Sequence, residues 1–225
     1  MRIGILQPGH APDEVRGSLG DYADMFEHLL DGHDFSFRRW DVVDDIFPDG
    51  PEEADGWLIT GSRHGVYEDH PWLPRLEALV REIVASGKPL VGVCFGHQVI
   101  AQALGGTVEK FKGGWAVGRR EYDFGDRTLA LNAWHQDQVV ALPPGAQVIA
   151  SNDFTQNAAL VIGNNVLTIQ PHPEFSADMI EGLIDHRSSS VPPELVGAAR
   201  AQLATPTDNA EFGQRMADFL RKGAK

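Results

Sequence analysis

The sequence predicts an α/β protein in which an open, mostly parallel and twisted sheet is flanked by helices. In the first half, short β-branched runs alternate with amphipathic stretches, which is typical of parallel strands joined by crossover helices. In the second half, short strands follow one another with Gly, Pro or Asn between them, which predicts an antiparallel extension of the sheet. At 225 residues and 42% hydrophobic composition, the chain is long enough for one large domain, and we expect a single domain over residues 1–225.

Four short apolar runs in the first half are predicted strands, at residues 2–6, 35–40, 56–60 and 89–93. Two helices are predicted between them from apolar residues at helical spacing: Leu19, Tyr22, Phe26, Leu29 and Leu30 for one, and Leu73, Leu76, Leu79, Val80, Ile83 and Val84 for the other. Gly87 follows the second set, where a glycine commonly ends a helix.

Six short strands are predicted in the second half, at residues 119–124, 127–131, 137–142, 146–150, 158–163 and 166–170. We interpret them as antiparallel additions at a sheet edge. Two helices are then predicted near 193–203 and 209–221, so that C-terminal helices occupy about residues 190 to 225.

Charge and composition exclude several classes of partner and compartment. Nineteen Lys and Arg against 32 Asp and Glu give a net charge of −13, which repels phosphate backbones and anionic lipid, so we expect no nucleic-acid or membrane partner. The N-terminal apolar run stops after Leu6, too early for a signal peptide, and no run reaches the roughly 20 apolar residues that span a bilayer. One cysteine forms no internal disulfide, and a free thiol is typical of a reducing compartment, so we expect a cytoplasmic protein.

That cysteine, Cys94, stands in "PLVGVCFGHQVIAQALGG" (89–106), which reads as a strand, a tight turn and a helix. This arrangement raises a nucleophile above the C-terminal edge of a sheet. Gly92 and Gly96 flank Cys94 where side chains would crowd a sharp turn, and the predicted helix N-terminus favours the thiolate. The alternative is that Cys94 only fills space in the core, as free cysteines often do.

A base for this nucleophile is predicted in "VLTIQPHPEF" (166–175), where a buried strand runs into His172 and Glu174 follows two residues later. Residues i and i+2 of an extended chain point the same way, so Glu174 can turn back to the imidazole. Pro171 and Pro173 hold the segment extended. Taken alone, His172 and Glu174 would be a hydrogen-bonded loop pair; together with Cys94 they form a nucleophile, a base and a group that orients the base.

"GVCFGHQ" and "QPHPEF", in that order, resemble the class I glutamine amidotransferases with a Cys-His-Glu triad, and are similar to the glutaminase domain of GMP synthetase. The resemblance covers roughly residues 40 to 185 and implies the flavodoxin-like amidotransferase fold. It implies that Cys94 attacks a γ-carboxamide and forms a thioester, that His172 carries the proton, and that Glu174 orients His172. The matching position after the nucleophile turn, Gln98, contacts substrate in that family.

The same resemblance assigns an oxyanion hole and further substrate contacts. One donor is the backbone N–H of Phe95, and the second is the N–H of Ser62, because Gly61-Ser62 stands where the family usually has Gly-Gly before a proline. Gly61 is also expected at the substrate. In "NAWHQDQVV" (132–140), Trp134 and His135 match positions that contact glutamine, although family members commonly carry a serine in place of Trp134. A tryptophan there would narrow the pocket or stack on a longer substrate, or it packs in the core.

The remaining histidines and the nucleotide motifs add no cofactor. His64 and His70 are six residues apart on a predicted loop without a carboxylate at a matching spacing, so we expect no metal site. His97 is expected on the helix surface or beside the site. No phosphate-binding glycine loop is found in the sequence, so we expect no cofactor and place the chemistry of any ammonia acceptor outside this chain.

Three functions remain open, and the sequence favours the first of them. The first is hydrolysis of glutamine to glutamate and ammonia, with a separate synthetase subunit as a candidate partner. The second is a γ-glutamyl peptidase with the same triad. The third is a non-catalytic DJ-1-like binding or stress-response protein, and the "His-Pro-Glu" segment argues against it, since those proteins place their acidic partner elsewhere.

Overall fold

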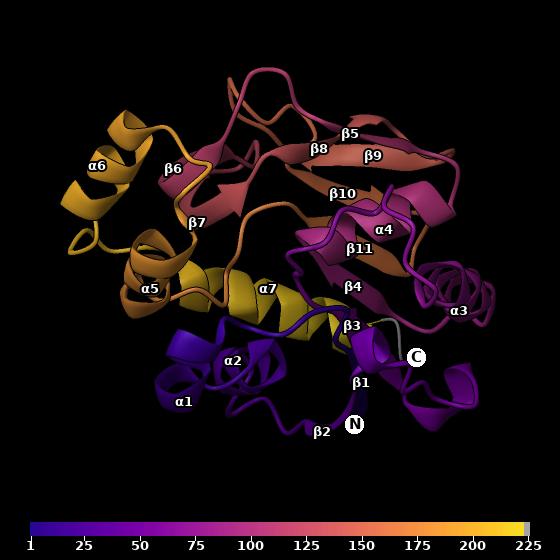
Figure 1. Ribbon diagram of the computed structural model, residues 1–225. Helices are drawn as coiled ribbons and strands as arrows, with labels where there is room; N and C mark the ends of the chain where they lie inside the picture. The colour runs from indigo at the N-terminus through magenta and orange to yellow at the C-terminus, as the bar shows by residue number, and fades with distance from the viewer. Residues whose placement is uncertain (223–225) are drawn as a thin grey trace.

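Seven strands form the central sheet, in the order β2-β1-β3-β4-β11-β10-β9 (Figure 1). The computed structural model describes residues 1–222 of the chain. Strands β2, β1, β3, β4 and β11 pair in parallel, whereas β10 is antiparallel to both of its neighbours. The strands are β1 (Arg2–Leu6), β2 (Ser36–Trp40), β3 (Gly56–Ile59), β4 (Leu90–Val93), β9 (Ala146–Ala150), β10 (Ala159–Ile162) and β11 (Val166–Ile169). The predicted mostly parallel α/β fold is confirmed.

The central strands β3, β4 and β11 are buried at every residue, which is the pattern of parallel strands covered on both faces. Alternate residues enter different cores. Trp57 and Ile59 of β3 pack in the core that contains α3 (Leu73–Ala85) and α4 (Phe95–Ala103), while Leu58 points to the opposite core. Helices α2 (Tyr22–Leu29) and α7 (Asn209–Lys222) cover that second face.

The first predicted helix is divided into two. Leu19 ends α1 (Asp13–Leu19), and the chain turns at Gly20, whose φ is +79°. Asp21 then starts α2 with a capping box, in which its side chain and that of Asp24 each accept a backbone N–H. Apolar spacing continues across the break, so periodicity alone predicts one helix where the caps make two.

The second half departs from the predicted antiparallel edge. Strands β6 (Ala116–Asp123) and β7 (Thr128–His135) form a separate two-stranded sheet, and so do β5 (Thr107–Lys110) and β8 (Asp137–Ala141). Strand β11 lies in the middle of the central sheet, parallel to β4. Only β9 and β10 extend the edge as expected.

The remaining helices lie in the C-terminal part of the chain, and two short 3-10 turns lie in its first half. Helix α5 (Ala177–Arg187) and strand β5 were not predicted, whereas α6 (Pro193–Ala201) and α7 match the two expected C-terminal helices. Short 3-10 turns at Val42–Asp44 and Pro51–Glu53 link β2 to β3. The last residues of the predicted C-terminal region, 223–225, lie outside the described residues, and the single-domain assignment stays a prediction. Among residues 1–222, no helix combines the length and apolar character needed to cross a membrane.

Candidate active site

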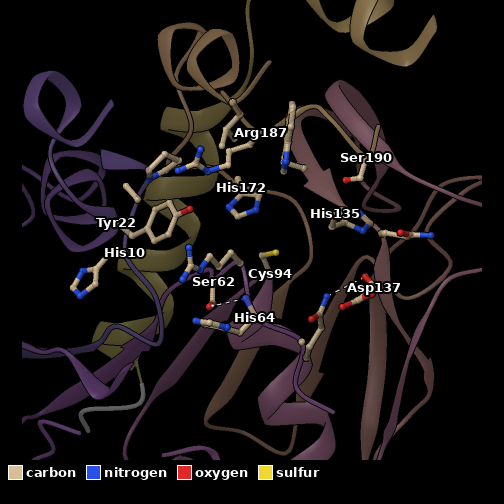
Figure 2. A pocket seen from close by; sticks show the side chains of 18 of the residues that line it. His10, Tyr22, Ser62, His64, Cys94, His135, Asp137, His172, Arg187 and Ser190 are labelled. Atoms are coloured by element: carbon tan, nitrogen blue, oxygen red, sulfur yellow. Dashed lines mark hydrogen bonds between the residues drawn. The ribbon is translucent and has the colours of Figure 1, made fainter. Parts of the chain in front are cut away.

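The carboxyl ends of β3, β4 and β11 meet at one edge of the sheet, and a pocket of about 590 Å³ opens there. Open α/β sheets place their ligand sites at this edge. Cys94 follows β4 directly, Ser62 lies beyond the end of β3, and His172 lies beyond β11. Figure 2 shows all three side chains facing the pocket, although they are far apart in the sequence.

Cys94 occupies a sharp turn between β4 and α4. Its φ of 52° and ψ of −102° are unusual for a residue with a side chain, and such strain is typical of functional sites. Its N–H donates to the carbonyl of Ile169 at 2.8 Å, which ties the turn to β11. The flanking glycines are required: a Cβ on Gly92 would lie 2.6 Å from the carbonyl oxygen of Gly96, and one on Gly96 would collide with the carbonyl of Ile59.

His172 is held from three directions. Its Nδ1 lies 2.7 Å from Oε1 of Glu174, and both side chains are buried. Its ring stacks on Phe175, with centroids 3.8 Å apart and planes within 4°. The backbone N–H of His172 donates to the carbonyl of Asn132 on β7 at 2.8 Å. The sheet of β6 and β7 therefore helps to position the imidazole.

The electrostatic balance favours a protonated His172. Burial by itself lowers the pKa of His172, but the negative charges of Glu174 and Cys94 outweigh burial and raise the pKa to about 10. Nδ1 is bonded to Glu174, so Nε2 is the nitrogen left for proton transfer in the pocket. A protonated imidazole beside the sulfur of Cys94 can return a proton to a leaving group.

Gly61 lies against both Cys94 and His172. A Cβ built on Gly61 would be 2.9 Å from Cε1 of His172 and 3.8 Å from Cβ of Cys94. Both side chains thus approach the same backbone position at the end of β3. No larger residue fits at Gly61 unless the imidazole moves.

Two backbone N–H groups are available for an oxyanion. Phe95 is the first residue of α4, where a helix leaves its N–H groups without intrahelical acceptors. Across residues 1–222, the N–H groups of Phe95 and Ser62 donate no intramolecular hydrogen bond. The Ser62 hydroxyl donates to the carbonyl of Pro8 at 3.0 Å and accepts from the N–H of His64 at 3.1 Å, which fixes the loop that carries the Ser62 N–H.

The predicted substrate-contact residues Gln98, Trp134 and His135 all line the pocket. The side-chain amide of Gln98 donates to the carbonyl of Asp137 and to Oε1 of Gln170, each at 3.0 Å. Burial, together with the nearby charge of His172, lowers the pKa of His135 to about 3, so its imidazole is neutral. Neither ring nitrogen of His135 has a hydrogen-bond partner within the described residues.

Of the other predicted site residues, Phe95, Gly61 and Glu174 pack beside Cys94 and His172 without lining the cavity. His97 does not lie on the helix surface, one of the two places expected for it, because it is fully buried and its Nδ1 lies 2.7 Å from the hydroxyl of Thr168. Burial lowers the pKa of His97 to about 3, which makes it a neutral core residue.

Much of the pocket wall was not predicted. Arg16 of α1 and Arg187 of α5 line one side, and Arg187 is paired with Glu14 at 3.0 Å. Tyr22 of α2 also lines the pocket and stacks on Phe175 at 6.0 Å. These residues lie on helices whose sequences contain no recognisable functional motif, so the sequence does not indicate that they line the pocket. His10 also lines the pocket, and its position after the first predicted strand was the one available clue.

Comparisons with known proteins identify relatives of this chain. Residues 32–181 match the family described as glutamine amidotransferase class-I. γ-Glutamyl peptidase 4 of Arabidopsis thaliana is 28% identical, over 92% of this chain and 90% of its own length. A GMP synthase of Leifsonia xyli is 29% identical over 75% of this chain, which corresponds to 39% of that protein. A glutamine amidotransferase structure from Methylobacillus flagellatus covers the whole chain with a TM-score of 0.76 at 22% identity, which shows the shared fold.

Proposed function

Because this chain belongs to the class I glutamine amidotransferase family, we propose that it hydrolyses γ-glutamyl amide bonds through a thioester on Cys94. One observation carries the proposal. Cys94 and the His172–Glu174 pair converge on Gly61 at the edge of a pocket of about 590 Å³. A nucleophile, a base and an orienting carboxylate in this relation are the parts that acyl transfer requires.

In the first half of the reaction, the sulfur of Cys94 attacks the γ-carbonyl carbon and forms a tetrahedral oxyanion. The N–H groups of Phe95 and Ser62 would stabilise that oxyanion, and each such donor is typically worth a few kcal/mol. His172 gives its proton to the leaving nitrogen as the carbon–nitrogen bond breaks. In the second half, His172 takes a proton from water, the hydroxide attacks the thioester, and glutamate leaves as Cys94 is restored.

Recognition of the glutamyl half is expected near Gln98, Trp134 and His135. Gln98 is anchored by two hydrogen bonds from its amide nitrogen, so its orientation is fixed before substrate arrives. The leaving group would occupy the side of the pocket bordered by the loop after β3, which contributes Arg63 and Tyr67 to the lining.

The room on that side favours a γ-glutamyl peptide as the substrate. A pocket of about 590 Å³ lies in the range of roughly 300 to 1,000 Å³ that encloses drug-sized ligands, whereas ammonia needs almost no space as a leaving group. The relatives named γ-glutamyl peptidase also align over nearly the full length of this chain. We therefore rank γ-glutamyl peptide hydrolysis first.

Glutamine hydrolysis is the second candidate, favoured by the similarity to the GMP synthases. In that case a separate synthetase subunit would cover the pocket and accept the ammonia. The isolated chain would then hydrolyse glutamine slowly, because its partner is missing.

A substrate panel distinguishes the two candidates. Initial rates of glutamate release are measured with glutamine, γ-glutamyl dipeptides and asparagine. We expect kcat/KM for at least one dipeptide to exceed that for glutamine by tenfold or more, which is about 1.4 kcal/mol in transition-state binding. Equal or better use of glutamine would favour the glutaminase, and asparagine should be inert in both cases.

The role of Cys94 is tested separately. A diazoketone analogue of glutamine should label one site per chain, and Cys94→Ala should abolish labelling and hydrolysis together. Hydrolysis by a folded Cys94→Ala variant would end the thioester proposal for every substrate in the panel.

A further inference from the structure

The loop after β3 brings three metal-ligating side chains together at the rim of the pocket. His64, Glu68 and His70 each offer one ligand atom, and these atoms lie within 4.8 Å of one another. Nε2 of His70 is 2.6 Å from Oε2 of Glu68, and Nδ1 of His64 is 3.6 Å from the same oxygen. Spacing in the sequence did not indicate this group, because the turn of the loop is what places Glu68 between the two imidazoles.

The backbone of the loop and the ring of His70 are held in place by neighbouring residues. The ring of His70 stacks on buried Trp72, with centroids 5.2 Å apart and planes within 10°. The N–H of His64 is bonded to the hydroxyl of Ser62, a bond drawn in Figure 2, and the N–H of Glu68 donates to the carbonyl of Gly65 at 3.1 Å. The loop backbone and the ring of His70 are therefore positioned before a metal binds, and the exposed side chain of Glu68 contacts both histidines.

We propose that His64, Glu68 and His70 bind a zinc ion, with water in the fourth position. In a tetrahedral zinc site with bonds of about 2.0 Å, the ligand atoms lie about 3.3 Å apart. The observed separations from Oε2 of Glu68, 2.6 and 3.6 Å, lie on either side of that value, and the ligand atoms of the two histidines lie within 4.8 Å of each other. Changes in side-chain rotamer, without movement of the loop backbone, would bring the three atoms to the tetrahedral spacing.

The chemistry of the ligand set favours zinc over the hard cations. Magnesium and calcium prefer an all-oxygen shell, whereas two imidazoles with one carboxylate suit zinc and its first-row neighbours. Arg63 is the adjacent cation that opposes binding, and it is exposed, so solvent screens its charge.

The proposed zinc site lies in the wall of the pocket, so a bound ion would affect the pocket. His64 and Glu68 line the cavity, and His64 is bonded to Ser62, whose N–H is the proposed oxyanion donor. A bound ion would cross-link the loop on the leaving-group side. Zinc binding can be tested independently of the proposed hydrolysis, because it is measured in a chain that lacks the nucleophile.

The experiment titrates zinc into the chelator-treated Cys94→Ala chain, against a chromophoric competitor. Removing the thiol prevents zinc from binding at Cys94 and His172 and being counted in error. We expect one ion per chain with a micromolar or lower dissociation constant, and Co²⁺ should give the visible absorption of a four-coordinate site.

In the same background, His64→Ala, Glu68→Gln and His70→Ala should each weaken binding at least tenfold. His28→Ala, which removes an exposed histidine on α2, is the matched control and should leave binding unchanged. Glu68 is largely exposed and its variant should fold, so it settles the question even if His70→Ala, which loses the stacking on Trp72, does not. A dissociation constant for zinc above 100 µM, or zinc binding that is unchanged in the His64→Ala and Glu68→Gln variants, would overturn the proposal.

Discussion

Replacing Gly61 with alanine should slow the reaction by displacing the imidazole of His172. The new Cβ would lie 2.9 Å from Cε1 of His172, whereas ordinary contacts of this kind begin near 3.4 Å. The ring must therefore move by at least about 0.5 Å, the difference between those two distances. It has nowhere free to go, because it is stacked on Phe175 and bonded to Glu174. The contact with Cβ of Cys94, at 3.8 Å, is ordinary, so the nucleophile should stay in place.

The size of the effect follows from the displacement. A shift of about 1 Å in a reacting group can cost about 100-fold in rate, so a shift of about 0.5 to 1 Å should reduce kcat by roughly 10- to 100-fold. That corresponds to about 1.4 to 2.7 kcal/mol of transition-state stabilisation. The added methyl group should also cost about 1 to 3 kcal/mol of stability by overpacking, which most folded domains tolerate.

Steady-state kinetics on the best γ-glutamyl substrate would measure the effect, with diazoketone labelling to count intact nucleophiles. We expect kcat to fall while KM changes little, because Gly61 does not line the pocket. Gly17→Ala is the matched control: its Cβ would meet nothing within 4 Å, it lies in α1, and alanine there should add up to about 1 kcal/mol of stability. Wild-type kcat in both variants would refute the placement of His172 as the base beside Gly61.

Three further predictions concern the base, its charge and the pocket loop. His172→Ala should be nearly inactive while Glu174→Gln retains more activity, since water can partly replace an orienting carboxylate; wild-type rates in both would make the segment structural. The pKa of His172 is raised from an ordinary 6.5 to about 10, so its protonation stabilises the fold fully below pH 6.5, and this stabilisation is lost as pH rises through 10. Between pH 6.5 and 10, urea unfolding should therefore show the wild type losing stability relative to Glu174→Gln. Parallel stability curves for the two proteins would contradict this prediction. Tyr67→Phe removes the 3.0 Å bond to Asp137 and should raise KM severalfold for dipeptides but not for glutamine; equal changes for both substrates would count against a leaving group bound by this loop.

The sequence was sufficient to predict the parts of the fold that local chemistry determines. Strands β3 and β4 are continuous apolar runs, and the turn at Cys94 is flanked by glycines that the structure shows to be sterically required. Strand β11 was predicted at nearly its observed bounds but was assigned to an antiparallel edge. Its neighbour is β4, and pairing between segments so far apart in sequence is not encoded in the pattern of either one.

The part of the site that could be predicted lies in its two motifs, one after β4 and one after β11. Each motif was recognisable alone, and family resemblance joined Cys94 to His172 before any pairing was known. The walls of the pocket are different, because Arg16 and Arg187 come from helices whose sequences look like ordinary solvated surfaces. Glu68 meets His64 and His70 only because the loop turns, and loop conformation is the least predictable feature of a single sequence.

The loop after β3 departs from the family pattern, and its side chains bond to the elements on either side of it. Where the family usually has glycine and proline, Ser62 ties the loop to the end of β1 through the carbonyl of Pro8, and Tyr67 ties it to β8 through Asp137. A loop with an anchor on each side can border the leaving-group side without a docked protein. A glycine in place of Ser62 would not supply the hydroxyl that donates to Pro8. An amidotransferase that relies on a synthetase to cover its pocket does not need these anchors, whereas a peptidase must hold the amine side of its substrate within one chain. The two anchors therefore add to the pocket volume and the peptidase relatives as grounds for ranking γ-glutamyl peptides above glutamine.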